Sequence, residues 1–292
     1  MSTIVMTGAT SGLGAIAARI IAATPDTRVL VGTRGKKVDG VELAPLDLGG
    51  LASVREFARI VRERLGDTRI DALVLNAGIG SGGKQRRTED GYETVFATNH
   101  LAHYLLLRLL TPQLSSTATV VVTTSDTHDP KLNKVAAPRH AYADLLAFPS
   151  DSGGPTALAG FRAYSSSKLC NLLTARGFAR RSEAEGKHFS VVAYNPGLTP
   201  ETQLNRDAGP TVQALTRTVV PLVRRFVHIN SAEEAGRTLA DLTLGGARPP
   251  QGRIYASLVR GKLTWPDPSQ LAQSNDAMTS LWEQSAALVG LD

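Results

Sequence analysis

One stretch near the start of the chain decides the fold: Thr7-Gly8-Ala9-Thr10-Ser11-Gly12-Leu13-Gly14. It directly follows the apolar stretch Thr3 to Thr7 and opens an amphipathic segment over Gly12 to Thr24, which predicts a strand, a tight turn and a helix. Glycines let the backbone turn sharply and approach a ligand, and the helix N-terminus stabilises an anion such as a pyrophosphate. We therefore predict a phosphate site, with a plain glycine turn as the alternative. Its residues are Gly8, Thr10, Ser11, Gly12, Leu13 and Gly14.

The alternation of strand and helix continues along the chain. Short β-branched runs predict strands at Thr3–Thr7, Arg28–Thr33, Val41–Leu46, Ala72–Asn76, Thr119–Thr124, Ser190–Tyr194 and Arg253–Ala256. Helical spacing predicts helices at Gly12–Thr24, Leu51–Leu65, Gly91–Leu110, Ala163–Glu185, Ser231–Leu244 and Asn275–Val289, the last after Ser274 as N-cap. We found no Pro/Gly/Ser-rich linker and no repeat. The pattern predicts an α/β fold, a single doubly wound Rossmann-type domain over residues 1–292 with a mostly parallel sheet of approximately seven strands and helices on both faces.

Two segments interrupt this alternation of strands and helices. Residues 126–162 are rich in Pro, Gly, Asp and His and are too long for an ordinary connection, so we expect a functional insertion near the site. Residues 198–230 alternate apolar side chains such as Leu215 and Val219 with basic ones such as Arg224 and Arg225. This second segment is either packed on the body or a lid over an apolar substrate, and its basic stretch from Leu215 to His228 also allows peripheral membrane contact.

Composition excludes several classes of protein. The formal net charge is +6, from 32 Lys and Arg against 26 Asp and Glu. These charges are scattered, so we expect no nucleic-acid partner. No apolar run reaches the roughly 18 residues of a membrane span, and the N-terminus lacks a secretory pattern. Cys170 is the only cysteine, which excludes an internal disulfide and predicts a reducing, cytoplasmic location. We expect no metal, because His100 and His103 have no third ligand at a suitable spacing.

The end of the second predicted strand selects the cofactor. Dinucleotide folds place an acidic residue here to accept ribose hydroxyls, whereas this chain has neutral Thr33 followed by Arg34, a donor suited to phosphate. NADP(H) is therefore predicted over NAD(H), with a solvated basic turn as the alternative. Asp47 and Leu48, after the third strand, are expected to contact the adenine. The link from Gly35 to Gly40 is too short for a normal parallel crossover, so either a helix is missing or the third strand is misplaced.

Tyr164 and Lys168 lie four residues apart and hence on one face of a predicted helix. A free tyrosine has a pKa of about 10, and bringing it to about 7 requires roughly 4 kcal/mol of preference for the phenolate. A neighbouring cation supplies such a preference, so the pair is a credible acid/base.

Taken together, these motifs resemble the short-chain dehydrogenase/reductase family over essentially the whole chain. The matching positions are residues 7–14, Asn76-Ala77-Gly78, Asn99, Ser125, the Tyr164/Lys168 pair and Asn195-Pro196-Gly197. The sequences Thr98–His103 and Tyr164–Asn171 are most similar to the retinol dehydrogenase and protochlorophyllide reductase branch. The long connection from Ser125 to Tyr164 also matches the protochlorophyllide reductase branch, whereas a single cysteine does not.

The resemblance implies a role for each residue. Tyr164 exchanges a proton with the substrate oxygen, Lys168 lowers the Tyr164 pKa and holds the nicotinamide ribose, and Ser125 hydrogen-bonds the substrate oxygen. Asn99 positions a water and Lys168 in a proton relay. Other cofactor contacts are Asn76, Ala77 and Gly78 and, at the nicotinamide, Pro196, Gly197 and Thr199 or Thr202. Each position also has a structural alternative, such as a strand-end cap for Ser125 or an ordinary turn for Pro196-Gly197.

We therefore predict an NADP(H)-dependent oxidoreductase that acts on the carbonyl or alcohol of a hydrophobic small molecule. Light-dependent reduction of a protochlorophyllide-type pigment and a non-catalytic NADP(H) sensor are the alternatives. Family members often pair through the helices that carry Asn99 and Tyr164, which by analogy predicts a homodimer or homotetramer.

Overall fold

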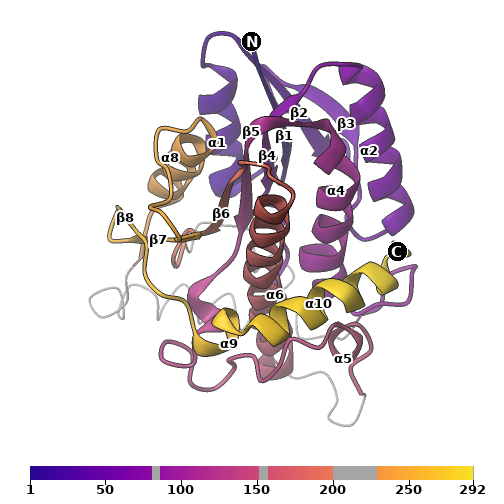
Figure 1. The fold of residues 1–292 in the computed structure, drawn as a ribbon, viewed down its shortest axis with the longest axis vertical. Helices are drawn as coiled ribbons and strands as arrows, with labels where there is room; N and C mark the ends of the chain where they lie inside the picture. Colours follow the sequence, from indigo (N-terminus) through magenta and orange to yellow (C-terminus); the bar gives the residue numbers. More distant parts are fainter. Residues whose placement is uncertain (81–85, 151–156, 200–228, 292) are drawn as a thin grey trace.

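An eight-stranded sheet forms the centre of the protein, in the spatial order β3-β2-β1-β4-β5-β6-β7-β8 (Figure 1). The computed structural model describes residues 1–80, 86–150, 157–199 and 229–291. Neighbouring strands run parallel except β7 and β8, which are antiparallel. The strands are β1 (Ser2–Thr7), β2 (Thr27–Thr33), β3 (Glu42–Pro45), β4 (Ile70–Leu75), β5 (Leu114–Thr123), β6 (Ser190–Asn195), β7 (Tyr255–Val259) and β8 (Lys262–Thr264). All seven predicted strands are present, and the short β8 is an addition.

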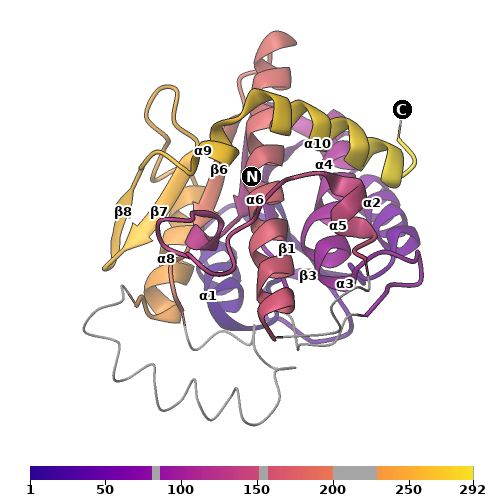
Figure 2. The same ribbon diagram turned by 90° about the horizontal axis from the view of Figure 1, so that it is seen from below.

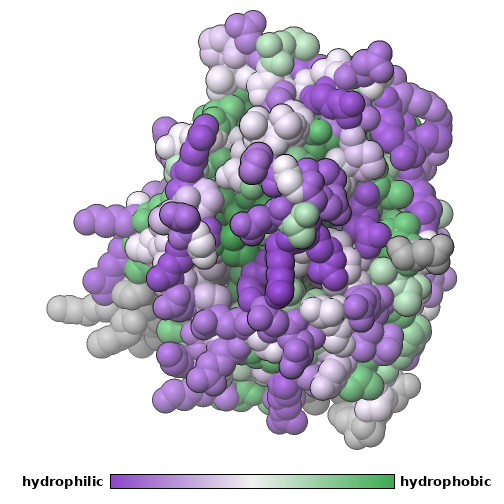
Figure 3. All heavy atoms as spheres, in the orientation of Figure 1, coloured by the Kyte–Doolittle hydropathy of each residue, from purple (hydrophilic) through white to green (hydrophobic). Residues whose placement is uncertain are grey.

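Helices cover both faces of the sheet (Figures 1 and 2). On one face lie α1 (Gly12–Ala22) and α8 (Ala232–Thr243), and on the other lie α2 (Leu51–Leu65), α4 (Ala102–Leu110) and α6 (Ala157–Ala184). Strand side chains alternate between two cores, so that in β1 Val5 belongs to the α2/α4/α6 side while Ile4 and Met6 belong to the α1/α8 side. The outer face over α6 is mostly hydrophilic (Figure 3). This arrangement confirms the predicted doubly wound fold.

The sheet reverses its direction of growth between β1 and β4. From β1 the chain moves outward through β2 to β3, and it then returns to place β4 against the other side of β1. Ligands of open α/β sheets bind at the carboxyl ends of the strands at such a switch point. Figure 2 views the molecule from this end.

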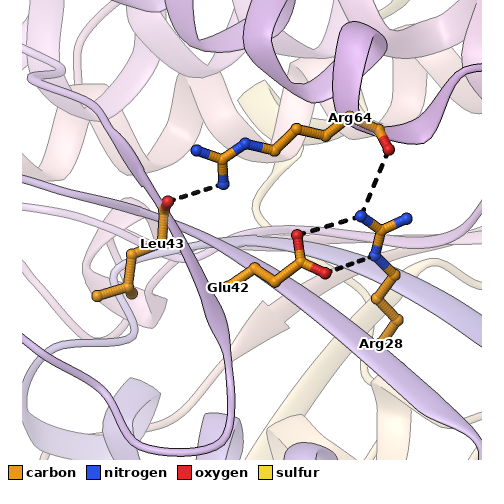
Figure 4. A network of polar contacts seen from close by, with 4 residues as sticks. All are labelled: Arg28, Glu42, Leu43 and Arg64. Carbon is orange, nitrogen blue, oxygen red and sulfur yellow. Dashed lines mark hydrogen bonds and ion pairs between the residues drawn. The ribbon is translucent and has the colours of Figure 1, made fainter.

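The link between β2 and β3 contains no helix. β3 nevertheless pairs parallel to β2, with Leu30 opposite Glu42 and Thr33 opposite Pro45, so the missing-helix alternative is the correct one. Side chains hold this short edge strand instead (Figure 4): the Arg28 guanidinium donates to the Glu42 carboxylate at 2.6 and 3.1 Å, and Arg64 donates to the Leu43 carbonyl at 2.8 Å. The adenine end of a bound dinucleotide would therefore lie beside an open edge.

Several boundaries differ from the prediction. The expected helix over Gly91–Leu110 begins only at Thr94, because Gly91 has a φ of +84° and the Glu93 carboxylate caps the N–H groups of Val95 and Phe96. Helix α6 begins at Ala157, so the end of the 126–162 segment is helical. The two short helices α5 (Ala143–Ala147) and α9 (Gln270–Gln273) were not predicted, whereas α10 (Asn275–Leu288) starts after Ser274 as expected.

The first part of the 126–162 segment packs closely on the body. The His128 ring lies edge-on to Tyr255 at 5.3 Å, Asn133 donates to Ser165 at 3.2 Å, and the backbone N–H of Ala143 donates to Gln284 at 2.7 Å. These contacts fix the chain that runs from Ser125 towards Tyr164. Among the described residues, no helix is both long and apolar enough to cross a membrane.

Candidate active site

The glycine-rich turn connects β1 to α1. Gly8 has a φ of +71°, and a Cβ there would lie 2.6 Å from the Cα of Ala77, so both conformation and space require glycine. A Cβ on Gly14 would lie 2.0 Å from the Gly8 carbonyl oxygen. Ser11 is the N-cap of α1, and its hydroxyl makes no capping hydrogen bond. The first N–H groups of α1 and the Ser11 hydroxyl are thus placed to bind an anion, with Thr10 half-buried beside them and Leu13 anchored in the core.

The turn after β4 locks this glycine-rich turn in place. The Thr7 hydroxyl oxygen accepts hydrogen bonds from the backbone N–H groups of Asn76 at 3.0 Å and Ala77 at 3.1 Å. The Asn76 amide donates to the Gly8 carbonyl at 3.0 Å. The predicted motif Asn76-Ala77-Gly78 therefore meets the phosphate turn directly at the switch point.

Asn99 lies in a π-helical segment, η1 (Ala97–Leu101), in the middle of the α3 (Thr94–Phe96) to α4 helix. Its side chain is fully buried: Oδ1 accepts from the N–H of Ile79 at 2.8 Å, and Nδ2 donates to the Ile79 carbonyl and the Ser167 hydroxyl, each at 3.0 Å. Single π turns are frequent at functional sites because they redirect one side chain. Here the Asn99 side chain, presented by the π turn, ties this helix to Ile79, which follows Gly78.

Helix α6 carries Tyr164 and, one turn later, Lys168. Lys168 is buried, and its Nζ donates to the Thr123 carbonyl at 3.2 Å, at the end of β5. The Thr124 hydroxyl donates in turn to the Lys168 carbonyl at 2.6 Å. These bonds join α6 to the end of β5, next to Ser125.

The four predicted catalytic residues converge at the carboxyl end of the sheet. A Cβ on Gly78 would lie 3.2 Å from the Lys168 Nζ and 3.4 Å from the Asn99 Oδ1, so these two polar groups meet over that glycine. Lys168 Nζ lies 5.8 Å from the Tyr164 ring centre, and the Ser125 hydroxyl lies near enough to the Tyr164 phenol to lower its pKa. The structure thus brings Asn99, Ser125, Tyr164 and Lys168 together.

Burial controls the electrostatics of this group. It lowers the pKa of Lys168 to about 8, and it raises the pKa of Tyr164 above the usual value, whereas the nearby Ser125 hydroxyl acts to lower it. The expectation that Lys168 lowers the Tyr164 pKa stays a prediction. In this structure the Lys168 ammonium donates to the Thr123 carbonyl, and desolvation of the phenol has the largest effect on the Tyr164 pKa.

The turn after β6 forms the predicted nicotinamide side. Gly197 has a φ of +70°, and its N–H donates to the Asn195 Oδ1 at 3.0 Å. The fully buried Asn230 donates to the carbonyls of Pro196 at 2.9 Å and Leu258 at 2.8 Å. Asn230 thus joins the two ends of the 198–230 segment, where Leu198 and Ile229 pair. The remainder of that segment, including Thr202 and the basic stretch over 215–228, lies outside the described residues, whereas Thr199 is buried beside the turn.

The predicted adenine side is more open. Arg34 is exposed directly after β2, and the buried Thr33 hydroxyl bonds the backbone of Lys36 at 3.1 Å. Asp47 is exposed after β3, with one carboxylate oxygen accepting from the N–H of Gly49 at 2.9 Å, and Leu48 is half-buried next to it. Both charged side chains remain accessible to a dinucleotide.

Comparison with known proteins identifies this arrangement. A model of the short chain dehydrogenase family matches residues 2–137. The chain is 31% identical to protochlorophyllide reductase B, chloroplastic, of Oryza sativa subsp. japonica, across 99% of this chain and 77% of that protein. This chain belongs to the short-chain dehydrogenase family. It is also 31% identical to the protochlorophyllide reductase of Avena sativa over 99% of both chains.

A solved structure has a similar fold. A putative uncharacterized protein from Mycobacterium Paratuberculosis has 30% identity and a TM-score of 0.73, covering 100% of this chain and 94% of the other. The predicted family is confirmed, and the two protochlorophyllide reductases agree with the predicted branch.

Two histidines of this short-chain dehydrogenase serve the scaffold. His103 lies between the Asn99 carbonyl, at 3.0 Å from Nδ1, and the Thr7 hydroxyl, at 2.9 Å from Nε2, while His100 Nε2 lies 2.9 Å from the Ser285 hydroxyl. Among the described residues, no group of three or more His, Cys, Asp and Glu could hold a metal ion. Burial in the core raises the pKa of the Cys170 thiol, which suits a packing role.

Sequence reasoning missed the structural use of His103 and Asn230. The spacing of Asn99 and His103, four residues apart on one helix, was the available signal for the first of them. For Asn230 no local signal exists, because the two segments that it contacts, the turn after β6 and the β7–β8 hairpin, are distant in sequence.

Proposed function

We propose that this short-chain dehydrogenase is an NADPH-dependent oxidoreductase that transfers hydride between the nicotinamide and the carbonyl or alcohol group of a hydrophobic small molecule. The observation that carries the proposal is the meeting of Tyr164 and Lys168 with Ser125 and Asn99 at the switch point of the sheet. A protein that only sensed the cofactor would need no proton donor beside the nicotinamide position.

NADP(H) is supported by charge at two places. The uncapped N-terminus of α1 suits the pyrophosphate, and the exposed Arg34, followed by Lys36 and Lys37, suits a 2′-phosphate. No acidic side chain stands at the end of β2 to accept ribose hydroxyls and repel that phosphate.

The residues divide the chemistry among them. NADPH, when bound, supplies the hydride. Tyr164 gives its phenolic proton to the substrate oxygen during reduction, and Ser125 donates a hydrogen bond that stabilises the charge developing on that oxygen. Lys168, held by Thr123, presents an ammonium to the ribose hydroxyls. Asn99 holds the neighbouring backbone in place, which supports the transfer of a proton back to Tyr164 after reduction.

The hydrophobic character of the substrate is supported by exposed apolar side chains near Tyr164. Leu158 is 43% exposed and Phe161 45% exposed on the first turns of α6, and the Phe161 ring lies nearly parallel to that of Tyr164, with centres 6.3 Å apart. Leu198, 43% exposed, follows the nicotinamide turn. Exposed apolar groups beside a catalytic phenol fit an apolar substrate better than a charged one.

The first experiment follows NADPH consumption in the dark across aldehydes and ketones of increasing chain length. NADH serves as the alternative cofactor and Tyr164→Phe as the control. We expect turnover with NADPH that favours longer apolar substrates and is lost in Tyr164→Phe, while NADPH binding is retained. Arg34→Ala should weaken NADPH binding by about tenfold or more and leave NADH binding unchanged. Turnover that survives Tyr164→Phe would contradict the assigned role.

A second candidate is a light-dependent reductase of a protochlorophyllide-type pigment. It is favoured by the names of the relatives, which are 31% identical over nearly the whole chain. The same protein with NADPH and protochlorophyllide, assayed under illumination and in the dark, separates the two candidates. Turnover of the pigment only under light would select the second, and turnover of simple ketones in the dark would select the first.

A further inference from the structure

Asp126 is an acidic group in the catalytic site that the proposed mechanism does not use. It follows Ser125 and begins a short 3₁₀ turn, η3 (Asp126–His128). Its Oδ1 accepts from the Ser125 hydroxyl at 3.4 Å, and the Asn195 side chain at the end of β6 lies near enough to lower the Asp126 pKa. The carboxyl group is therefore held against the residue that is to bind the substrate oxygen.

The Ser125 hydroxyl has one hydrogen to donate. Its oxygen already accepts a hydrogen bond from the Thr127 N–H at 3.3 Å, which fixes the side chain. An ionised Asp126 can only accept, so it competes with the substrate for the single Ser125 hydrogen. A protonated Asp126 has a hydrogen of its own, which it can donate to the Ser125 oxygen, and the Ser125 hydrogen is then free for the substrate.

We propose that Asp126 is a positioning residue whose protonated form turns the Ser125 hydroxyl towards the substrate oxygen and whose ionised form withdraws it. This inference rests on the proposed function, because it concerns how the same site binds the oxygen of a carbonyl substrate.

Burial of Asp126 favours its protonated form, which is the form that frees the Ser125 hydrogen. Burial raises the pKa of this carboxyl group, against the effects of the nearby Asn195 amide, the His128 charge and the Ser125 hydroxyl. The titratable groups facing it are Tyr164 from α6, Tyr255 from β7 and His128 from its own turn. The negative charge of Asp126 raises the pKa of Tyr164, so the ionised form also opposes phenolate formation.

Burial lowers the pKa of His128, against the Ser125 carbonyl and the negative charges of Asp129 and Asp126. Its Nδ1 donates to the Ser125 carbonyl at 2.6 Å, and its Nε2 accepts from the Ser269 N–H at 3.4 Å. Both ring nitrogens are thus engaged by a neutral imidazole.

The test compares kcat for ketone reduction against pH, from about pH 4 to about pH 8, in the wild type, Asp126→Asn and Asp126→Ala. We expect wild-type kcat to fall with rising pH along a limb that Asp126→Asn lacks, since its amide donates to Ser125 at every pH. At neutral pH, Asp126→Asn should then exceed the wild type by about threefold or more. Asp126→Ala, which cannot orient Ser125, should be slower at acid pH. Asp144→Asn, an exposed acid in α5, is the matched control and should keep the wild-type profile.

An Asp126→Asn profile identical to that of the wild type would overturn the proposal, and so would an Asp126→Asn enzyme as slow as Asp126→Ala. NADPH binding, measured on each variant, checks that the fold and the cofactor site persist.

A readout without turnover separates this inference from the proposed function. In carboxyl ¹³C NMR of the whole chain, Ser125→Ala removes a hydrogen bond that favours the ionised carboxylate, so the Asp126 titration midpoint should rise. An unchanged midpoint would contradict the coupling of Ser125 with Asp126 even in an active enzyme. Loss of all Tyr164-dependent turnover would instead refute the proposed function, and with it the role of this coupling in reduction.

Discussion

The imidazole of His103 lies 2.9 Å from the hydroxyl of Thr7, and this contact joins the end of β1 to α4 across 96 positions of sequence. Because His103 Nδ1 faces the Asn99 carbonyl, which can only accept, the ring carries its hydrogen on Nδ1 and accepts from Thr7 at Nε2. The Thr7 oxygen in turn accepts from Asn76 and Ala77. Thr7 thus couples the phosphate turn to Asn99.

Replacement of Thr7 by Val is expected to destabilise the protein. The variant keeps the shape of the side chain but leaves two backbone N–H groups and one imidazole nitrogen without their partner, at about 1–3 kcal/mol for each buried group. Urea unfolding should show the loss, and NADPH affinity should fall with it. Thr7→Ser keeps the hydroxyl and should stay within about 1 kcal/mol of the wild type. Equal stability of the two variants would show that the hydroxyl network is not needed.

Acid should destabilise the fold through its two buried histidines. Burial lowers the pKa of His100 to about 3 and that of His103 to about 4, whereas in the unfolded chain the pKa is about 6.5. The unfolded state therefore binds more protons below about pH 6.5, so stability is fully present above that pH and decreases as the pH falls towards 3. Each histidine contributes up to about 1.4 kcal/mol per pH unit in this window.

His100→Asn measures one of these contributions. The slope of unfolding free energy against pH should become shallower by about 1.4 kcal/mol per unit, whereas the exposed His188→Asn should leave it unchanged. Burial raises the pKa of Glu93 and Asp126, and these raised pKa values oppose the acid destabilisation caused by the histidines. The wild type, His100→Asn and His188→Asn all contain both carboxyl groups, so this contribution cancels in the comparison. The same slope in all three would exclude His100 as an acid-sensitive group.

Gly8→Ala should damage both the fold and cofactor binding. The new Cβ would meet the backbone of Ala77 at 2.6 Å in addition to the strain of a φ of +71°. We expect a loss of more than about 2 kcal/mol in unfolding free energy together with weakened NADPH binding. Gly66→Ala is the matched control, because Gly66 has a φ of +54° but open space around it. It should cost only the backbone strain, about 1–3 kcal/mol, and leave NADPH binding intact.

The position of α10 bears on the assembly of the protein. This helix lies across α6 (Figure 1), and its Trp282 ring packs edge-on to Tyr104 of α4 at 5.0 Å and beneath the guanidinium of Arg181 of α6 at 4.4 Å. Analogy with family members predicts pairing of copies through the helices that carry Asn99 and Tyr164, whereas α10, which packs on these helices, favours a monomer. We expect light scattering after size exclusion to give the mass of a monomer, 30.9 kDa. A dimer whose cross-links map to α4 and α6 would show that α10 moves away.

The sequence predicted the parts of this protein whose signals are local. The glycine turn, the alternation of strands and helices and the Tyr164/Lys168 pair each lie within a few residues, and the α2 boundaries, Leu51 and Leu65, were predicted correctly. The helix that carries Asn99 was predicted to begin at Gly91. The structure shows that it begins at Thr94, after the Glu93 cap, and periodicity alone does not reveal such a cap. Local periodicity does not distinguish the first turn of a helix from the residues that precede it.

The features that escaped prediction depend on distant contacts. Asn230 is held by groups on Pro196, Leu258 and Gly261, and none of these is near it in sequence. The effect of burial on Tyr164 was missed for the same reason, since the spacing to Lys168 is visible in the sequence but the desolvation of the phenol is not. Tertiary packing, rather than any motif, decides these properties.

Phe161 offers a direct test of the hydrophobic substrate. Its ring is 45% exposed and lies within 9° of parallel to the catalytic Tyr164 ring, so an apolar group bound beside the phenol would contact it. Phe161→Ala removes that surface. We expect KM for long-chain ketones to rise roughly threefold or more, with little change for short ones and none in NADPH affinity. Leu244→Ala, a comparably exposed apolar residue that follows α8, should change neither value. An equal rise in KM for short and long substrates would place Phe161 in support of the Tyr164 helix and not in substrate selection.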